Sequence, residues 1–137
     1  MSVLPLQRDL ISAPFFDATA RGALLLQRCT ACRHWSAPEK IACTRCRATT
    51  LAWEQASGMG AVVSWAVVHP KPGHGTPTVV GIIELDEGPW MRGQLRLRAD
   101  AAHIGMRVAT GFAAADGGET IPVFDPQPES GYRESTN

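Results

Sequence analysis

The sequence predicts a mainly β protein with an N-terminal helix, a small metal-binding ribbon and a five-stranded barrel. Three observations predict this arrangement. The four cysteines of the chain form two C-x-x-C pairs within residues 29–46. Short runs rich in β-branched residues, broken by glycine and proline, follow from residue 57 onward. A single helical turn is predicted after the third run, and five strands in this order are typical of the OB-fold, a Greek-key barrel.

Residues 1–22 are predicted to form an arm followed by a helix. Ser12 is a candidate N-cap of the helix, Pro14 fits its first turn, and Gly22 suits the position just past its C-terminal end. The arm and helix carry more large apolar side chains than a small ribbon can bury, and exposed apolar clusters usually mark an interface. The residues predicted to bind a partner are Leu6, Leu10, Phe15 and Phe16.

Residues 23–56 are predicted to form a zinc ribbon. Cys29 and Cys32 form the first C-x-x-C pair, and Cys43 and Cys46 form the second. Four thiolates at this spacing can surround one Zn²⁺ tetrahedrally, with each pair on its own tight turn. Because four sulfurs fill the coordination shell, the metal is expected to be structural. An iron site would use the same ligands, whereas disulfides or a redox pair fit the sequence less well.

Residues 57–126 are predicted to form the OB-fold barrel. Gly81 is expected to mark a bulge or bend in the second strand. Residues 127–137 are rich in Pro, Glu, Ser and Gly, and this tail is expected to be disordered. The expected strands cover residues 60–68, 78–85, 90–98, 106–113 and 119–124, with the helical turn near 99–103.

Composition and charge limit the possible functions. Apolar residues make up 45% of the 137 residues, so the chain can form a core. We expect a cytoplasmic protein with no membrane partner, because no apolar run could cross a bilayer and no signal-peptide pattern is present. The net charge is zero, and residues 21–47 carry six basic residues against one acidic residue. From residue 48 onward six basic residues stand against ten acidic ones, which makes nucleic acid an unlikely partner.

The sequence contains no convincing set of catalytic residues. All four thiols are expected to bind metal, so none is available as a nucleophile. Neither a G-x-S-x-G elbow nor a phosphate-binding glycine loop is present. The clustered carboxylates Glu84, Asp86 and Glu87 lie next to a predicted turn, where a solvated face is the simplest interpretation. The chain alone is therefore predicted to have no enzymatic activity.

The cysteine ribbon and the strands that follow it together resemble a known family, the acyl-CoA-associated OB-fold proteins with an N-terminal rubredoxin-like zinc ribbon. The resemblance covers roughly residues 13–126. In the ribbon, Arg33 follows the first cysteine pair where a glycine is usual in the family. Outside the ribbon, the motifs that carry the resemblance are Trp53, Ser57-Gly-Met-Gly60, Ile83-Glu-Leu-Asp-Glu-Gly88, Ile104-Gly-Met-Arg-Val108 and Pro122-Val-Phe124.

The resemblance implies an accessory subunit. Members of this family are companions of thiolase-like enzymes, including lipid-transfer-protein-like aldolases that cleave steroid side chains, polyketide-type acyltransferases and archaeal acetoacetyl-CoA thiolase assemblies. It implies that this chain scaffolds a thiolase-fold partner, in a heterotetramer, and helps to hold the acyl-CoA.

Two further expectations concern ligands of the ribbon and barrel. Because cationic side chains match phosphate geometry, Arg33, Lys40 and Arg45 are the candidate contacts to the phosphates of the acyl-CoA. The alternative function is a small nucleic-acid-binding module, since OB-folds and zinc ribbons also serve that role.

Overall fold

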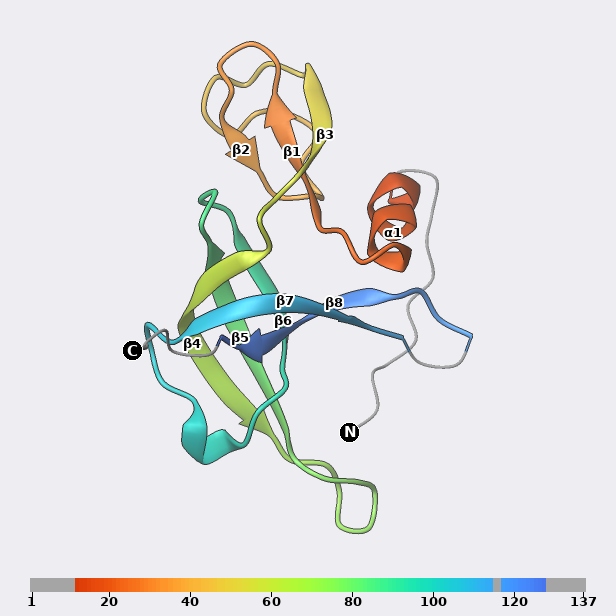
Figure 1. The fold of residues 1–137 in the computed structure, drawn as a ribbon, viewed down its shortest axis with the longest axis vertical. Helices are drawn as coiled ribbons and strands as arrows, with labels where there is room; N and C mark the ends of the chain where they lie inside the picture. The colour runs from red at the N-terminus through yellow and green to blue at the C-terminus, as the bar shows by residue number, and fades with distance from the viewer. Residues whose placement is uncertain (1–11, 115–116, 128–137) are drawn as a thin grey trace, which may run out of the picture.

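The computed structural model describes residues 12–114 and 117–127. Leu6 and Leu10 of the predicted partner surface, and residues 128–137 of the predicted tail, lie outside the described residues. Figure 1 shows the ribbon at one end of the molecule and the barrel below it, with the helix α1 beside the joint between them. No helix among the described residues is long and apolar enough to span a membrane.

The helix α1 spans Ala13–Ala20, as the sequence signals predict. Ser12 occupies the N-cap position, although its side chain makes no capping hydrogen bond. At the other end Gly22 adopts a φ of 77°, which glycine reaches without steric cost. The N–H groups of Gly22 and Ala23 donate to the carbonyls of Thr19 and Ala18, respectively, and these two hydrogen bonds cap the C-terminus of the helix.

The ribbon is a three-stranded antiparallel sheet in the order β2-β1-β3. Its strands are β1 (Leu25–Cys29), β2 (Trp35–Ser36) and β3 (Leu51–Gln55). Strand β2 was not predicted, because two residues are too few to show a period.

The second part is a closed barrel with the strand order β4-β5-β6-β8-β7, which confirms the predicted OB-fold. The predicted helical turn is the 3-10 helix η1 (Ala99–Ala101), which follows the third strand of the barrel. The last strand continues to Pro126, so Asp125 lies in the barrel wall. The strands are β4 (Met59–Val68), β5 (Thr78–Leu85), β6 (Trp90–Leu95), β7 (Arg107–Ala113) and β8 (Ile121–Pro126).

The bulge expected at Gly81 lies in the neighbouring strand. The β4–β5 register shifts between Val62 and Ser64, so the extra residue belongs to β4. Gly81 is required for a different reason, since a Cβ at this position would lie 2.9 Å from Leu95 Cδ1 in the core. Both explanations produce a glycine inside a strand, and the sequence alone could not separate them.

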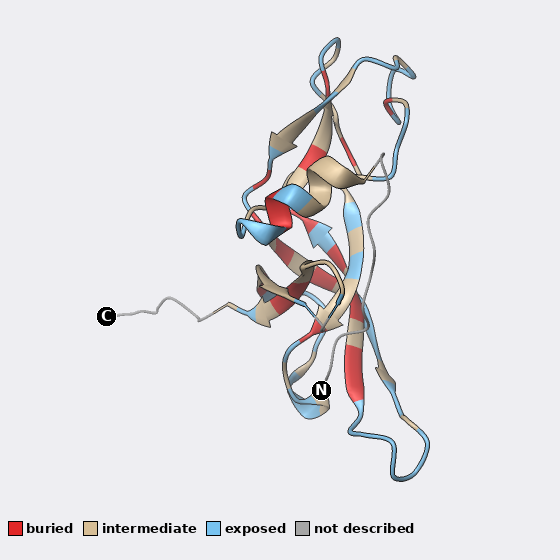
Figure 2. Cartoon of the chain, turned by 90° about the vertical axis from the view of Figure 1, so that its right-hand side faces the viewer, coloured by how far each residue is buried: buried red, intermediate tan, exposed pale blue. Residues whose placement is uncertain are grey.

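The hydrophobic core runs without a break from the base of the ribbon into the barrel. Leu24 and Leu26, on either side of the start of β1, belong to the same cluster of buried side chains as Ile83 and Phe124 of the barrel. Figure 2 shows buried residues along the barrel strands, whereas the long loop between β4 and β5 is exposed. The shared core holds the ribbon against the barrel, and it therefore fixes the surface between them.

Candidate metal centre and junction groove

The four cysteines come together at the tip of the ribbon. Their sulfur atoms all lie within 4.8 Å of one another. The Sγ atoms of Cys29 and Cys46 are 3.6 Å apart, and so are those of Cys32 and Cys43. A tetrahedral Zn²⁺ with bonds of about 2.3 Å requires about 3.8 Å between sulfurs, so the donor set fits a zinc ion.

Each C-x-x-C pair forms the same tight turn around its first sulfur. The N–H groups two and three residues after Cys29 donate to its Sγ at 3.4 and 3.5 Å, and both equivalent bonds to Cys43 are 3.4 Å. Hydrogen bonds to sulfur favour the thiolate. The Cys32 N–H accordingly lowers the pKa of Cys29 to about 6, and the Cys46 N–H lowers the pKa of Cys43. Both sulfurs are thereby prepared for metal binding.

The residue after each pair has a left-handed backbone conformation. Arg33 has a φ of 69° and Arg47 has a φ of 68°. A glycine would adopt this conformation at lower cost than an arginine. The N–H of Arg33 donates to the Cys29 carbonyl at 3.0 Å, and the N–H of Arg47 donates to the Cys43 carbonyl at 2.9 Å. These bonds help to hold both arginines in the strained conformation.

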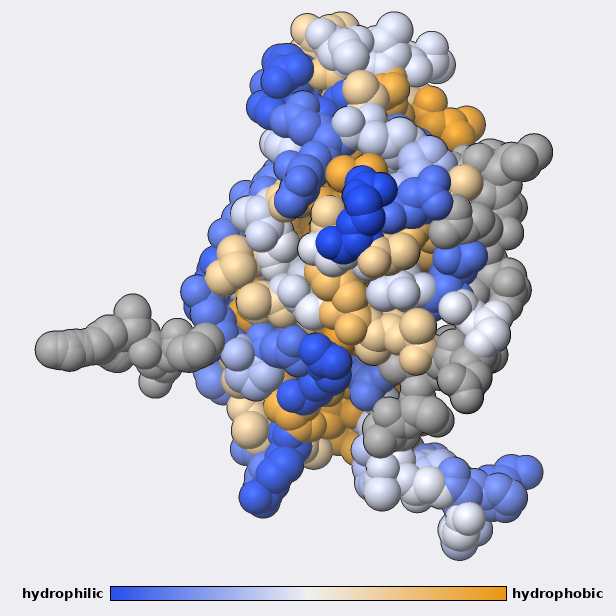
Figure 3. Space-filling view, turned by 45° about the vertical axis from the view of Figure 1, so that its right-hand side comes forward, coloured by the Kyte–Doolittle hydropathy of each residue, from blue (hydrophilic) through white to orange (hydrophobic). Residues whose placement is uncertain are grey.

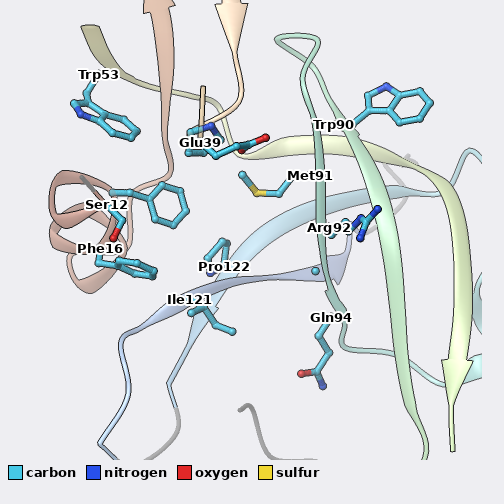
Figure 4. A pocket seen from close by; sticks show the side chains of 13 residues that line it. Ser12, Phe16, Glu39, Trp53, Trp90, Met91, Arg92, Gln94, Ile121 and Pro122 are labelled. Atoms are coloured by element: carbon cyan, nitrogen blue, oxygen red, sulfur yellow. The ribbon is translucent and has the colours of Figure 1, made fainter. Parts of the chain in front are cut away.

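A groove with a volume of about 740 Å³ lies where α1, the ribbon and the barrel meet. We call it the junction groove. Figure 4 shows Phe16 and Trp53 on its helix side, with Trp90 and Arg92 across from them. Figure 3 shows apolar atoms over the middle of the helix side of the molecule, between ribbon and barrel. The groove is lined by Ser12, Phe15, Phe16, Pro38, Glu39, Trp53, Trp90, Met91, Arg92, Gly93, Gln94, Ile121 and Pro122.

The structure places the two predicted phenylalanines in this groove. Their rings pack edge to face, with centroids 5.3 Å apart. Phe15 also packs against the core, so part of its role is structural. Trp53 and Trp90 complete the aromatic lining, and Trp90 is 56% exposed. These tryptophans were not predicted as site residues, because they lie on different strands whose side chains come together only in the folded chain.

One buried side chain ties the helix to the barrel. Thr19 is 1% exposed, and its Oγ1 lies 2.5 Å from the Thr120 carbonyl oxygen and 3.0 Å from that of Phe16. Thr120 directly precedes β8, so this hydroxyl sets the distance between α1 and the barrel strand on the other side of the groove. This contact therefore joins α1 to the barrel beside the groove.

Two further hollows adjoin the junction groove. The barrel-face hollow, about 470 Å³, lies over β4, β5 and β6, and it shares Arg92, Gly93 and Gln94 with the groove. The ribbon-side hollow, about 330 Å³, shares Glu39 and Trp90 with it. Strand β6 is thus common to all three, and we call the three adjoining hollows the recessed surface.

The three cationic side chains predicted to contact acyl-CoA do not converge. Lys40 lines the ribbon-side hollow. Arg33 lies 3.9 Å from a carboxylate oxygen of Glu54 on β3 and lines none of these hollows, and neither does Arg45. The ribbon is small, so neighbouring residues of its loops point in different directions around it. Of the three predicted contacts, Lys40 alone borders the recessed surface.

The clustered carboxylates form structural contacts. Arg107 donates two hydrogen bonds of 2.9 Å to Asp86, and the pKa of Asp86 is lowered by them. Glu87 accepts a hydrogen bond from the Ser57 N–H at 2.7 Å, and Glu84 accepts one from Trp90 Nε1 at 3.4 Å. Each carboxylate thus has a partner in the described part of the chain. The arrangement gives none of them the environment of a general base.

Two family models match consecutive parts of the chain. Residues 16–52 match the family model described as the ChsH2 rubredoxin-like zinc ribbon domain, and residues 53–113 match the ChsH2 C-terminal OB-fold domain. The chain is 35% identical over 97 residues to a DUF35 domain-containing scaffold protein of Methanocaldococcus jannaschii, covering 67% of this chain and 69% of that protein. The chain belongs to the ChsH2 (DUF35) family.

Three further similar proteins are known by name or structure. A solved structure titled as the Ltp2-ChsH2(DUF35) aldolase matches with a TM-score of 0.76 and 34% identity, over 87% of this chain and 96% of that chain. A probable enoyl-CoA hydratase alpha subunit of Thermomonospora curvata is 35% identical over 118 residues, and this chain spans 37% of its length. A DUF35 protein of Sulfolobus solfataricus, 10% identical with a TM-score of 0.63, shares the fold.

The ChsH2 zinc-ribbon model also bears on the metal. The matched residues 16–52 include all four cysteines, whose sulfurs have the separation that zinc requires. The family model supports a structural zinc ion, and the sulfur positions are compatible with it. Zinc has no redox chemistry, and a shell of four thiolates leaves no coordination position for water, so the ion would supply only stability.

Proposed function

We propose that this ChsH2-family chain is a non-catalytic accessory subunit, which binds a thiolase-fold enzyme and helps to hold that enzyme's acyl-CoA substrate. The junction groove is the observation that carries this proposal. The names of the relatives support it, since one is a scaffold protein, one is an enoyl-CoA hydratase subunit and one is solved with an aldolase. We further propose a cytoplasmic heterotetramer with two copies of each subunit.

The junction groove has the composition of a protein interface. Phe16, Trp53 and Trp90 present large rings from three different elements of the fold. Aromatic residues are enriched at the centres of interfaces, where a few of them supply most of the binding energy. A soluble chain exposes such a cluster at a cost, and a partner that covered it would remove that cost.

The acyl-CoA would lie beside this interface, at the ribbon-side hollow. Lys40 and His34 line this hollow together with the hydroxyl-bearing residue Thr44. An ammonium group is a suitable contact for a phosphate. We therefore retain Lys40 as the proposed phosphate contact because it lines this hollow, where its Nζ lies 4.0 Å from a carboxylate oxygen of Glu39. Arg33 lies outside the hollow, 3.9 Å from Glu54.

The purified chain is expected to show no thiolase, hydratase or aldolase turnover of acyl-CoA thioesters. The reason is that the described residues assemble neither a nucleophile nor a base, and the four thiols are committed to zinc. Turnover should appear when the thiolase-fold enzyme is added, and Lys40→Glu should then raise the KM for the acyl-CoA. An acyl-CoA turnover that follows the isolated chain through every column would overturn this proposal.

A further inference from the structure

Strand β6 has an open edge that faces the junction groove. On one side, residues Trp90–Leu95 pair with β5. On the other side, β6 pairs with β8 at a single position, Leu95 opposite Phe124. In the described part of the chain no strand pairs with this edge between residues 90 and 94. All five of these consecutive residues line the groove, which is the pattern expected where a backbone edge forms its wall.

The backbone groups on this edge can be assigned from the hairpin that joins β5 to β6. The Leu85 N–H donates to the Pro89 carbonyl at 2.9 Å, so these two residues form a hydrogen-bonded pair. Hydrogen-bonded and non-hydrogen-bonded pairs alternate along an antiparallel ladder. Met91 and Gly93 therefore direct their backbone groups to β5, whereas Trp90 and Arg92 direct theirs away from β5, on the side of the groove. The Arg96 N–H follows the same alternation and donates to the Phe124 carbonyl at 2.8 Å.

An unpaired strand edge with apolar surroundings is a template for another strand. Proteins usually protect such edges with charges, prolines or a covering segment. Here the edge runs beside Met91, Ile121 and Pro122, and proline on β8 offers no N–H of its own to complete the pairing. The backbone groups of Trp90 and Arg92 on this edge match the hydrogen-bonding needs of an extended segment.

The side chain of Arg92 indicates what that segment carries. Arg92 is exposed, and the described residues give it no ion pair or hydrogen bond, in contrast to Arg96 and Arg107, which each hold an aspartate. Figure 4 shows Arg92 and Trp90 projecting from the same side of β6. A carboxylate on the outer face of an added strand would meet the Arg92 guanidinium there.

We propose that the open edge of β6 accepts an extended segment of the partner enzyme as an added strand. This inference rests on the proposed function and specifies how the partner docks. The segment has apolar residues at alternate positions, which enter the junction groove, and an acidic residue on its other face, which pairs with Arg92. Main-chain hydrogen bonds supply affinity in this mode of recognition, and the side-chain pockets supply specificity.

Two variants of one residue isolate the backbone contact. Both Arg92→Pro and Arg92→Ala remove the guanidinium, but Arg92→Pro also removes the N–H that faces the groove. Proline is tolerated on an edge where the N–H takes no part in the ladder, so the variant should fold, and thermal unfolding checks this. The probe is the Ltp2 aldolase of the similar complex. We expect Arg92→Pro to bind at least tenfold more weakly than Arg92→Ala.

Hydrogen exchange of the wild-type chain provides a test that does not depend on folding of a variant. The amides of Trp90 and Arg92 should exchange more slowly in the complex than in the free chain, and those of the exposed loop 69–77 should not change. Equal exchange at both edge amides, or equal binding by the two folded Arg92 variants, would refute the added strand. Protection of the same amides by acetyl-CoA alone would refute it too, because the groove would then hold the ligand.

The result that would contradict the proposed function differs from the results that would contradict the added strand. If neither Ltp2 nor any thiolase-fold enzyme of the chain's own organism forms a complex with the wild-type chain, the accessory role is wrong and the strand proposal falls with it. A complex that forms without protecting the β6 edge contradicts the strand proposal alone.

Discussion

Replacing Cys43 with serine is expected to release the zinc ion and unfold the ribbon. Cys43 is 2% exposed, and its sulfur lies 3.6 Å from that of Cys32. Structural zinc contributes on the order of 10 kcal/mol to the folding of small zinc domains, so the loss should exceed what the ribbon's short strands can replace. Most of the barrel should stay folded, because its closed sheet includes no ribbon strand.

Elemental analysis and circular dichroism measure the two parts of this prediction. The zinc content should fall from one ion per chain to near zero, with loss of near-ultraviolet signal from the ribbon tryptophans. Arg45→Ala is the matched control, since it keeps the backbone N–H that donates to the Cys43 sulfur. An unchanged zinc content in Cys43→Ser, or no metal in freshly purified reduced wild-type protein, would contradict the Cys₄ site.

Removing residues 1–22 is expected to weaken binding of the thiolase-fold partner by about 2–4 kcal/mol, the loss typical of a central interface anchor. The truncation deletes Phe15 and Phe16 from the junction groove, but it also exposes the core contact of Phe15. Phe16→Ala is the cleaner variant, because Phe16 lines the groove and is not part of the core cluster. It should account for a large share of the loss.

Isothermal titration with the partner measures this affinity. Ala20→Ser, on the exposed end of α1, is the control and should bind as the wild type does. Zinc content should be the same in all variants, since the helix holds no cysteine. If the truncated chain and Phe16→Ala both bind with unchanged affinity, the helix is not part of the interface and the barrel must carry it.

The metal centre and the barrel could be predicted because their signals are local in sequence. A C-x-x-C pair forms one tight turn, so Cys29 and Cys32 could be placed together without knowledge of the rest of the chain. The barrel strands are separated by glycines and prolines that end each run. The order of strands with one helical turn then leaves few ways to close a sheet, and the OB-fold is one of them.

The junction groove could not be predicted in the same way, because it is a product of tertiary packing. Trp53 and Trp90 belong to strands of different sheets, and each has an ordinary β-strand pattern in its own segment. The open edge of β6 could not be predicted from the sequence either, since a strand pattern does not show which of its residues pair with a neighbour on both sides. The basic residues of the ribbon were grouped because they are near in sequence, but the fold separates them. Lys40 borders the ribbon-side hollow, whereas Arg33 lies beside Glu54.

Native mass spectrometry of the chain co-expressed with its thiolase-fold enzyme tests the central claim most directly. The account predicts a complex that contains two copies of each subunit, with one zinc ion per ChsH2-family chain, and acyl-CoA turnover that requires the enzyme subunit. A chain that remains monomeric beside an enzyme of full activity would contradict the account.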